Sequence, residues 1–162
     1  MTLSSRLKSW LTNSRGEWYV VVQILLMFAV FLAPKWSKGT GSPSTIAAAL
    51  GWTLLLIGAV FSSLGTFELG RNLSPFPRPK NDSELIARGA YAVVRHPIYC
   101  GIIFLASGWS ILHSSILAMV LSVVLFLFFD LKARREERWL AEKFPEYVRY
   151  KRRVKKLIPF VY

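Results

Sequence analysis

The sequence predicts an all-α integral membrane protein with four transmembrane helices, an N-terminal interfacial helix and a cytosolic C-terminal amphipathic helical tail. Hydrophobic residues make up 53% of the 162 residues, and the mean hydropathy is +0.38, which lies above the range of soluble domains. Uncharged stretches long enough to cross a bilayer alternate with short charged segments. The length fits one domain, which we take as residues 1–162.

Residues 1–17 are expected to lie on the membrane surface, because apolar side chains recur there at helical spacing among basic ones. These apolar residues are Leu3, Leu7, Trp10 and Leu11. The uncharged stretch 18–34 follows and predicts the first transmembrane helix. No small-residue cleavage site stands out after it, so we interpret it as a retained anchor.

A second transmembrane helix is predicted for residues 44–67, in which Gly51, Gly58 and Gly65 recur every seventh residue. Their shared face indicates either close helix packing or a groove that admits a lipid tail. Three alternating prolines in residues 74–79 then prevent helix formation. This segment is either a linker or a lid over a bound ligand.

Residues 97–129 carry no formal charge and are longer than one transmembrane helix requires. A turn at residues 113–115 divides them into two transmembrane helices, 97–112 and 116–131. The tail, residues 130–160, is amphipathic, and its first helix can continue the fourth transmembrane helix into the cytosol until Pro145 ends it. The apolar residues from Tyr147 onward recur at near-helical spacing and predict a final segment on the lipid surface.

The positive charges fall almost entirely on one side of this topology. Of 21 lysines and arginines, 19 lie before the first span, between the second and third, or after the fourth. By the positive-inside rule these segments are cytoplasmic, so a multi-pass protein with its active site on the cytoplasmic face is expected. The basic residues alternate with apolar runs, so we expect membrane lipids as partners and no nucleic acid. The oligomeric state is not indicated.

The segment from Arg88 to Gly101 is the richest in chemical groups. Arg95 and His96 stand directly before Pro97, a residue suited to the first turn of a helix. A helix start offers free N–H groups and partial positive charge, which favour an anionic group. No metal-ligand spacing is present, so no metal is expected.

This segment, followed by Glu136-Glu137, resembles the isoprenylcysteine carboxyl methyltransferase family, to which the phospholipid N-methyltransferases are related. The resemblance rests on Gly89, Tyr91, Arg95-His96-Pro97, Tyr99 and Gly101, and it covers residues 70–160. It implies an enzyme that uses S-adenosyl-L-methionine to methylate a lipophilic or prenylated acceptor in the membrane. An isoprenylcysteine-type carboxylate is the expected acceptor.

The resemblance also implies cofactor contacts from the His-Pro-x-Tyr segment and one glutamate of the pair. The matching positions are His96, Pro97, Ile98, Tyr99, and Glu137 or Glu136. The chemistry of the cofactor adds further candidates, because it needs a flat apolar slot for adenine, an acid for its ammonium and a base for its carboxylate. The candidates are Tyr91, Tyr99 and Phe104 for the adenine, Glu136 or Glu137 for the ammonium, and Arg95 with His96 for the carboxylate.

An arginine near the glutamate pair is implied to hold the acceptor carboxylate. Arg134 lies three residues before Glu137 and is the best match, with Arg135 second. Together these three residues are the catalytic candidates. The alternative for Arg134 is an ordinary helix ion pair at the membrane surface.

Other functions stay open at this point. A phospholipid amine N-methyltransferase, an NADPH-dependent sterol-reductase-like enzyme and a non-catalytic membrane adaptor are the alternatives. Ile98 stands where the sterol reductases have asparagine, which counts against that reading. Within the resemblance, Ala90 and Pro145 depart from the usual proline and glycine, and four spans are fewer than in the eukaryotic enzymes.

Overall fold

The structure is a computed structural model that describes residues 16–36 and 41–162. Its long helices are α2 (Glu17–Trp36), α3 (Thr45–Leu69), α5 (Pro97–Leu112) and α6 (Ile116–Lys143). The short ones are the 3-10 turn η1 (Gly70–Asn72), α4 (Ala90–Val93) and α7 (Tyr147–Arg153). No strand occurs among the described residues, so the all-helical prediction is confirmed, whereas the expected helix in residues 1–17 lies almost wholly outside them.

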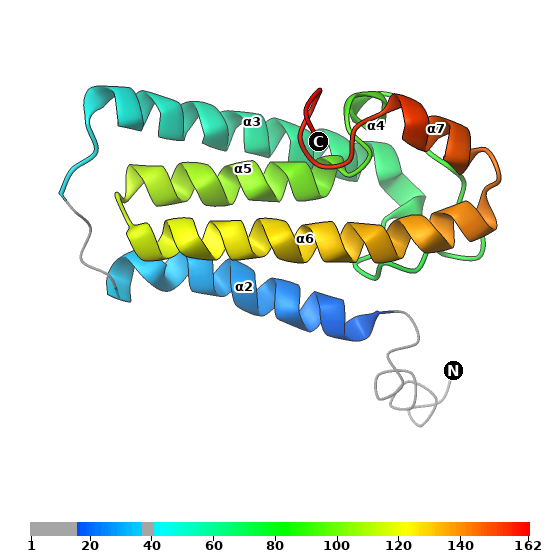
Figure 1. The fold of residues 1–162 in the computed structure, drawn as a ribbon, viewed down its shortest axis with the longest axis horizontal. Coiled ribbons are helices and arrows are strands. Elements are labelled where there is room, and N and C mark those ends of the chain that lie inside the picture. Colours follow the sequence, from blue (N-terminus) through cyan, green and yellow to red (C-terminus); the bar gives the residue numbers. More distant parts are fainter. Residues whose placement is uncertain (1–15, 37–40) are drawn as a thin grey trace.

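The four long helices lie side by side along the length of the molecule (Figure 1). By length and composition, α2, α6 and the stretch Thr45–Asn72 can each cross a membrane. Helix α5 has the predicted bounds, but its 16 residues rise only about 24 Å. Ser115 caps α6 by accepting a hydrogen bond from the Ala118 N–H, so the predicted turn at 113–115 is confirmed.

Three predicted helix ends differ from the observed ones, and the first is that of α3, which ends at Leu69 and not at residue 67. Helix α2 continues past Pro34 to Trp36, since a proline in the last turn interrupts little of the hydrogen-bond ladder. Helix α6 does not stop at residue 131 but runs unbroken to Lys143, which confirms that the fourth apolar stretch continues into the charged tail.

The seven-residue glycine spacing brings α3 against α5. Gly51, Gly58 and Gly65 are all buried, and a Cβ atom at Gly58 would lie 2.6 Å from the Gly101 carbonyl oxygen. A Cβ at Gly51 would meet Leu112 at 2.7 Å, so no larger side chain fits without a shift. Of the two interpretations, close packing is therefore the one observed.

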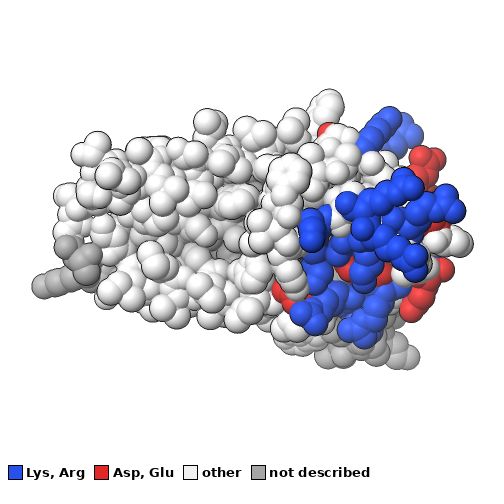
Figure 2. Space-filling view, turned by 45° about the horizontal axis from the view of Figure 1, so that its top comes forward, with Lys and Arg blue, Asp and Glu red and all other residues white. Residues whose placement is uncertain are grey.

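Charged side chains gather at one end of the molecule (Figure 2). The start of α2, the end of α3 and helix α7 meet there (Figure 1). Two further segments cover this end. We call residues 73–86 the strap and residues 154–162 the C-terminal hook.

The C-terminal hook packs on protein, not only on lipid. Its Leu157 is fully buried, as is Tyr147 at the start of α7. The Arg95 N–H donates to the Lys155 carbonyl at 2.8 Å, and the His96 N–H donates to the Lys156 carbonyl at 3.2 Å. The hook is therefore held by backbone hydrogen bonds to Arg95 and His96 and by Leu157 in the hydrophobic core, and its place on the lipid surface stays a prediction.

Candidate active site

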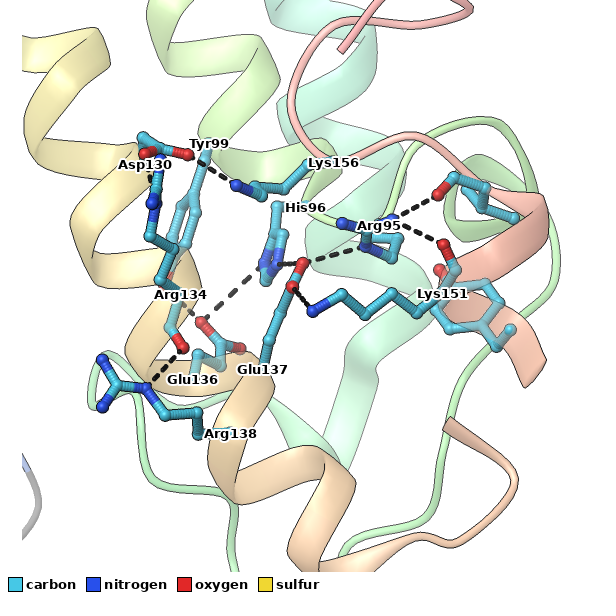
Figure 3. Close-up of polar contacts among 12 residues, drawn as sticks. Arg95, His96, Tyr99, Asp130, Arg134, Glu136, Glu137, Arg138, Lys151 and Lys156 are labelled. Atoms are coloured by element: carbon cyan, nitrogen blue, oxygen red, sulfur yellow. Dashed lines mark hydrogen bonds and ion pairs between the residues drawn. The ribbon is translucent and has the colours of Figure 1, made fainter. Parts of the chain in front are cut away.

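The site begins at the junction between α4 and α5. Gly89 has a φ of +57°, and a Cβ there would collide with the Glu68 carboxylate, which accepts the Ala90 N–H at 2.9 Å. His96 is the N-cap of α5 and Pro97 its first residue, as the sequence predicted. Backbone hydrogen bonds to the hook hold Arg95 and His96, and both side chains reach Glu137 of α6 (Figure 3).

Glu137 lies at the centre of a buried ion network (Figure 3). Its Oε1 accepts from Arg95 Nε at 2.8 Å and lies 3.2 Å from His96 Nε2. Its Oε2 lies 3.1 Å from Lys151 Nζ. The Glu137 side chain is 3% exposed, so its two oxygens are occupied by groups of the protein itself.

Glu136 is placed differently. Its side chain is 26% exposed, and its Oε2 accepts from the Tyr99 hydroxyl at 2.7 Å. The same oxygen lies 3.9 Å from His96 Nδ1, and the Tyr99 ring stacks on the His96 ring with centroids 5.3 Å apart. Glu136 is thus the less committed carboxylate of the pair.

Two cavities meet at the wall formed by His96 and Glu136. The first, which we call the tyrosine cavity, encloses about 80 Å³ beneath the strap. Besides strap residues, it is lined by Leu69, Asn72, Tyr91, Arg95, His96, Glu136, Leu140, Tyr147 and Tyr150. Burial, reinforced by the charge of Glu136, raises the pKa of Tyr91, and burial likewise raises the pKa of Tyr150, so both phenols stay protonated.

The second cavity, which we call the lysine cavity, encloses about 240 Å³ between α2, the strap, α5 and α6. It is lined by Gln23, Leu69, Leu73, Ser74, Pro75, His96, Ile98, Tyr99, Lys132 and Glu136. Lys132 is only 1% exposed, and its Nζ donates to Gln23 Oε1 at 2.5 Å and to the Pro75 carbonyl at 3.2 Å. Among the described residues no carboxylate forms an ion pair with this buried cation.

An apolar groove of about 280 Å³ lies one helical turn farther along the same helices. On α2 it begins at Met27, four residues after Gln23, and on α5 at Ile102, four residues after Ile98. Leu55 of α3 and Leu125 of α6 complete its walls. On α2 and α5 the apolar groove therefore begins one turn beyond the lysine cavity, in the part of the bundle expected to lie in lipid.

The strap is fastened over the tyrosine cavity by side chains from both neighbouring helices. Lys143 Nζ donates to the carbonyls of Lys80, Asn81 and Ser83 and, at 2.8 Å, to the Ser83 hydroxyl. Asn72 bonds the backbone of Glu84 in both directions, at 3.1 and 3.4 Å. These contacts make the strap a cover, as a lid requires.

Six of the predicted site residues line one or both of the two cavities. His96 and Glu136 line both cavities, Tyr91 and Arg95 line the tyrosine cavity, and Ile98 and Tyr99 line the lysine cavity. Pro97 is buried against Gly65, and Phe104 lies farther along α5 and lines neither cavity.

Both candidate arginines also lie outside the two cavities. Arg134 is 58% exposed and donates to Asp130 at 2.6 Å, one turn away on α6. The Arg135 guanidinium lies 4.7 Å from the centroid of the Trp139 ring. Neither arginine reaches the wall where the cavities meet.

Sequence reasoning missed Gln23, Lys132 and Tyr147 as site residues. From the sequence, Lys132 is assigned no role in the site. A signal was present, because Lys132 and Glu136 are four residues apart and so share a helix face. For Gln23 and Tyr147 the sequence offers no comparable signal.

Comparisons with known proteins bear on this site. The family described as phospholipid methyltransferase matches residues 46–147. The cobalt-zinc-cadmium resistance protein CzcN of Cupriavidus metallidurans is 31% identical over 160 residues, which cover 97% of this chain and 69% of that protein. Within the described residues, however, no three histidine, cysteine or acidic side chains are grouped to hold a metal ion.

The protein-S-isoprenylcysteine O-methyltransferase of Saccharomyces cerevisiae is 32% identical over 120 residues, which cover 72% of this chain and 50% of that enzyme. Enzyme B of the same name from Arabidopsis thaliana is 29% identical over 115 residues, which cover 68% of this chain and 58% of that enzyme. The chain thus spans only about half the length of these enzymes.

Proposed function

The chain belongs to the phospholipid methyltransferase family, and on this premise we propose a reaction for it. The protein transfers a methyl group from S-adenosyl-L-methionine to the carboxylate of a lipophilic acceptor in the membrane, of the isoprenylcysteine type. The resemblance drawn from the motif and the expectation of a methyltransferase are confirmed by the family match and by the named methyltransferases among its relatives. The acceptor, the cofactor and the site residues are the proposal.

The buried cation Lys132 is the observation that carries the choice of acceptor. A buried charge without a counter-ion is costly, and a bound anion removes that cost. A carboxylate in the lysine cavity would find the Lys132 ammonium beside the edge of the apolar groove. A protonated amine would meet a like charge there, so the geometry favours a carboxylate over a phospholipid amine.

The apolar groove supports a linear hydrocarbon tail on this acceptor. Its lining residues are aliphatic or aromatic and come from all four long helices. Burial of such a tail stabilises the complex by about 25 cal/mol for each Å² removed from water or headgroups. The head of the acceptor then stays at Lys132, seven residues, or about two turns of α6, from Leu125 in the groove.

The tyrosine cavity has the donor set that the adenosyl cofactor needs. Glu136 presents a partly exposed carboxylate for an ammonium, and the rings of Tyr91 and Tyr150 offer flat faces for a purine. When bound, S-adenosyl-L-methionine would supply an activated methyl group. The residues of this chain orient the two ligands where the cavities meet, beside His96 and Glu136, and exclude water. This orientation lowers the barrier of the reaction without a covalent step.

The strap is proposed to be the lid of the cofactor site. The tyrosine cavity encloses about 80 Å³, whereas small-molecule sites usually measure about 300 Å³ or more. The cofactor therefore enters only when the strap moves outward, and closure of the strap would shield the reaction from water.

The finer topology is also part of the proposal. We place α5 and α6 as a hairpin of two transmembrane helices, with the short α5 held against α3 by the glycine contacts. The charged end shown in Figure 2 then lies on the cytoplasmic side. A cysteine at Ser114, in a Cys100→Ser background, should react with a reagent added outside intact cells, and one at Ser83 should not.

The reaction is tested with protein reconstituted in vesicles and isotope-labelled S-adenosyl-L-methionine. We expect a farnesylated cysteine with a free carboxylate to gain a base-labile methyl ester, and its carboxamide to gain no label. Phosphatidylethanolamine is the second acceptor in the assay. Methylation of its amine in place of the carboxylate would overturn the assignment, as would binding of NADPH but not of S-adenosylhomocysteine in calorimetry.

A further inference from the structure

Three tyrosines line the tyrosine cavity, and their hydroxyl groups differ in what they contact. The Tyr91 hydroxyl donates to the Gly65 carbonyl at 3.3 Å. The Tyr150 hydroxyl donates to the Tyr91 carbonyl at 2.5 Å. Both hydroxyls are thus used to fasten α4 to its neighbours.

The Tyr147 hydroxyl is the exception. Tyr147 is 1% exposed, and within the described part of the chain its hydroxyl has no hydrogen-bond partner. A buried hydroxyl without a partner loses its bonds to water and gains nothing in return, so it destabilises the ligand-free protein. Such a group is kept at little cost only where a ligand supplies the missing acceptor.

The groups first expected to bind the cofactor carboxylate are in part committed to other partners. Arg95 uses Nε for Glu137 and Nη1 for the carbonyls of Lys151 and Val154. His96 faces Glu137 through Nε2. Among the side chains that line the cavity with Arg95 and His96, Tyr147 retains an uncommitted donor.

We infer that the Tyr147 hydroxyl donates a hydrogen bond to the carboxylate at the amino-acid end of the adenosyl cofactor, while Glu136 binds the ammonium of the same end. This inference rests on the proposed function and deepens it by assigning the two charged groups of that end to two side chains. An amino-acid end carries both charges close together, and Tyr147 and Glu136 line the same cavity.

The phenol is a proton donor over the whole working range of pH. Burial, reinforced by the negative charge of Glu137, raises the pKa of Tyr147 far above its ordinary value. The hydroxyl thus stays protonated and can donate to a carboxylate.

The test is Tyr147→Phe, measured with two ligands that differ in the amino-acid end. S-adenosylhomocysteine carries this end, and 5′-methylthioadenosine lacks it. Calorimetry on detergent-purified full-length protein should show that the substitution weakens S-adenosylhomocysteine about tenfold, as expected for a hydrogen bond to a charged group, and leaves methylthioadenosine within about twofold. The melting temperature of the ligand-free variant should equal or exceed that of the wild type, because an unpartnered buried hydroxyl has been removed.

Tyr150→Phe is the matched control, since its hydroxyl has a protein partner. We expect this variant to melt at a lower temperature without ligand and to keep the wild-type ratio of the two affinities. An unchanged ratio in Tyr147→Phe, with wild-type protein that binds S-adenosylhomocysteine, would overturn the assignment of Tyr147 and leave the proposed function intact. Absence of S-adenosylhomocysteine binding by the wild type would overturn the proposed function itself.

Discussion

The tyrosine cavity and the lysine cavity share one wall but differ in nearly everything else. Leu69, Ser74, His96 and Glu136 line both. On one side of this wall the strap covers a small space edged by phenols and charged side chains. On the other side a buried ammonium faces a larger space, and an apolar groove begins one turn farther along α2 and α5.

The difference between the two cavities matches the difference between the two ligands of the proposed reaction, the methyl donor and the acceptor. A polar, water-soluble donor suits the side that opens toward the charged end of the molecule, and an amphiphile suits the side that faces the apolar helices. The two meet only at the shared wall. Variants on either side should therefore affect one ligand and spare the other, and variants in the wall should affect the meeting of both.

The largest effect is expected for Lys132→Met. Loss of the buried ammonium removes the partner of the acceptor carboxylate, so kcat/KM for a farnesylated cysteine should fall about 100-fold, equal to about 2.7 kcal/mol of barrier. The affinity for S-adenosylhomocysteine, measured by calorimetry, should stay within about threefold. Lys132→Arg keeps the charge and should retain more activity than the methionine variant. A loss of cofactor affinity as large as the loss of turnover would place Lys132 on the donor side.

The second-largest effects are expected for glutamine substitutions at the adjacent residues Glu136 and Glu137, which should change different properties. Glu136→Gln should weaken S-adenosylhomocysteine about 30-fold, near 2 kcal/mol, because a charge-assisted hydrogen bond to the ammonium is lost. Glu137→Gln should instead lower the free energy of unfolding by about 3 kcal/mol, since Arg95 and Lys151 lose their buried counter-charge.

Calorimetry and thermal melting in the same detergent compare the two glutamine variants directly. A stable Glu137→Gln protein with weakened cofactor binding would return Glu137 to the list of cofactor ligands implied by the family resemblance. The two roles drawn here would then have to be exchanged.

A smaller, kinetic effect is expected for Lys143→Met. The strap loses the ammonium that binds its backbone at residues 80–83, so S-adenosylhomocysteine should associate and dissociate about fivefold faster with little change in affinity. Stopped-flow fluorescence measures both rates. Arg138→Met is the control, because Arg138 is exposed and donates only a 3.4 Å bond to the Arg134 carbonyl. Equal rates in the two variants would show that the strap is a linker.

The smallest effect is expected for Arg134→Lys. Its exposed pairing with Asp130 contributes little, so turnover should stay within about threefold of the wild type. The motif-based hypothesis, in which Arg134 grips the acceptor carboxylate, requires a loss of at least about tenfold at unchanged cofactor affinity. That result would move the acceptor head away from Lys132 and make Arg135 the next residue to test.

The sequence was sufficient to predict those features that depend on local pattern. Helix α5 has the predicted bounds because a proline and a polar turn delimit an uncharged run. The glycine contacts followed from a seven-residue period, and the position of His96 at a helix start followed from the proline beside it.

The features that depend on partners distant in the chain could not be predicted. Glu136 and Glu137 differ in exposure because Arg95 and Lys151 reach only one of them. The spacing of Lys132 and Glu136 indicates a shared helix face, but the Lys132 ammonium is held in the lysine cavity by Gln23, 109 positions earlier, and by the Pro75 carbonyl, 57 positions earlier. No periodicity or motif in one sequence carries that information.

The glycine contacts between α3 and α5 also determine how the molecule can exchange its lipid-soluble ligands. The backbones of α3 and α5 pack so closely that a small separation would break their whole interface. The two helices therefore behave as one rigid unit. Helix α2 forms one side of the apolar groove, so for the proposed reaction we expect the lipid-soluble ligands to exchange with the bilayer along α2. In the proposed reaction, esterification would cancel the charge that Lys132 attracts, and the neutral product would leave along α2 without crossing water.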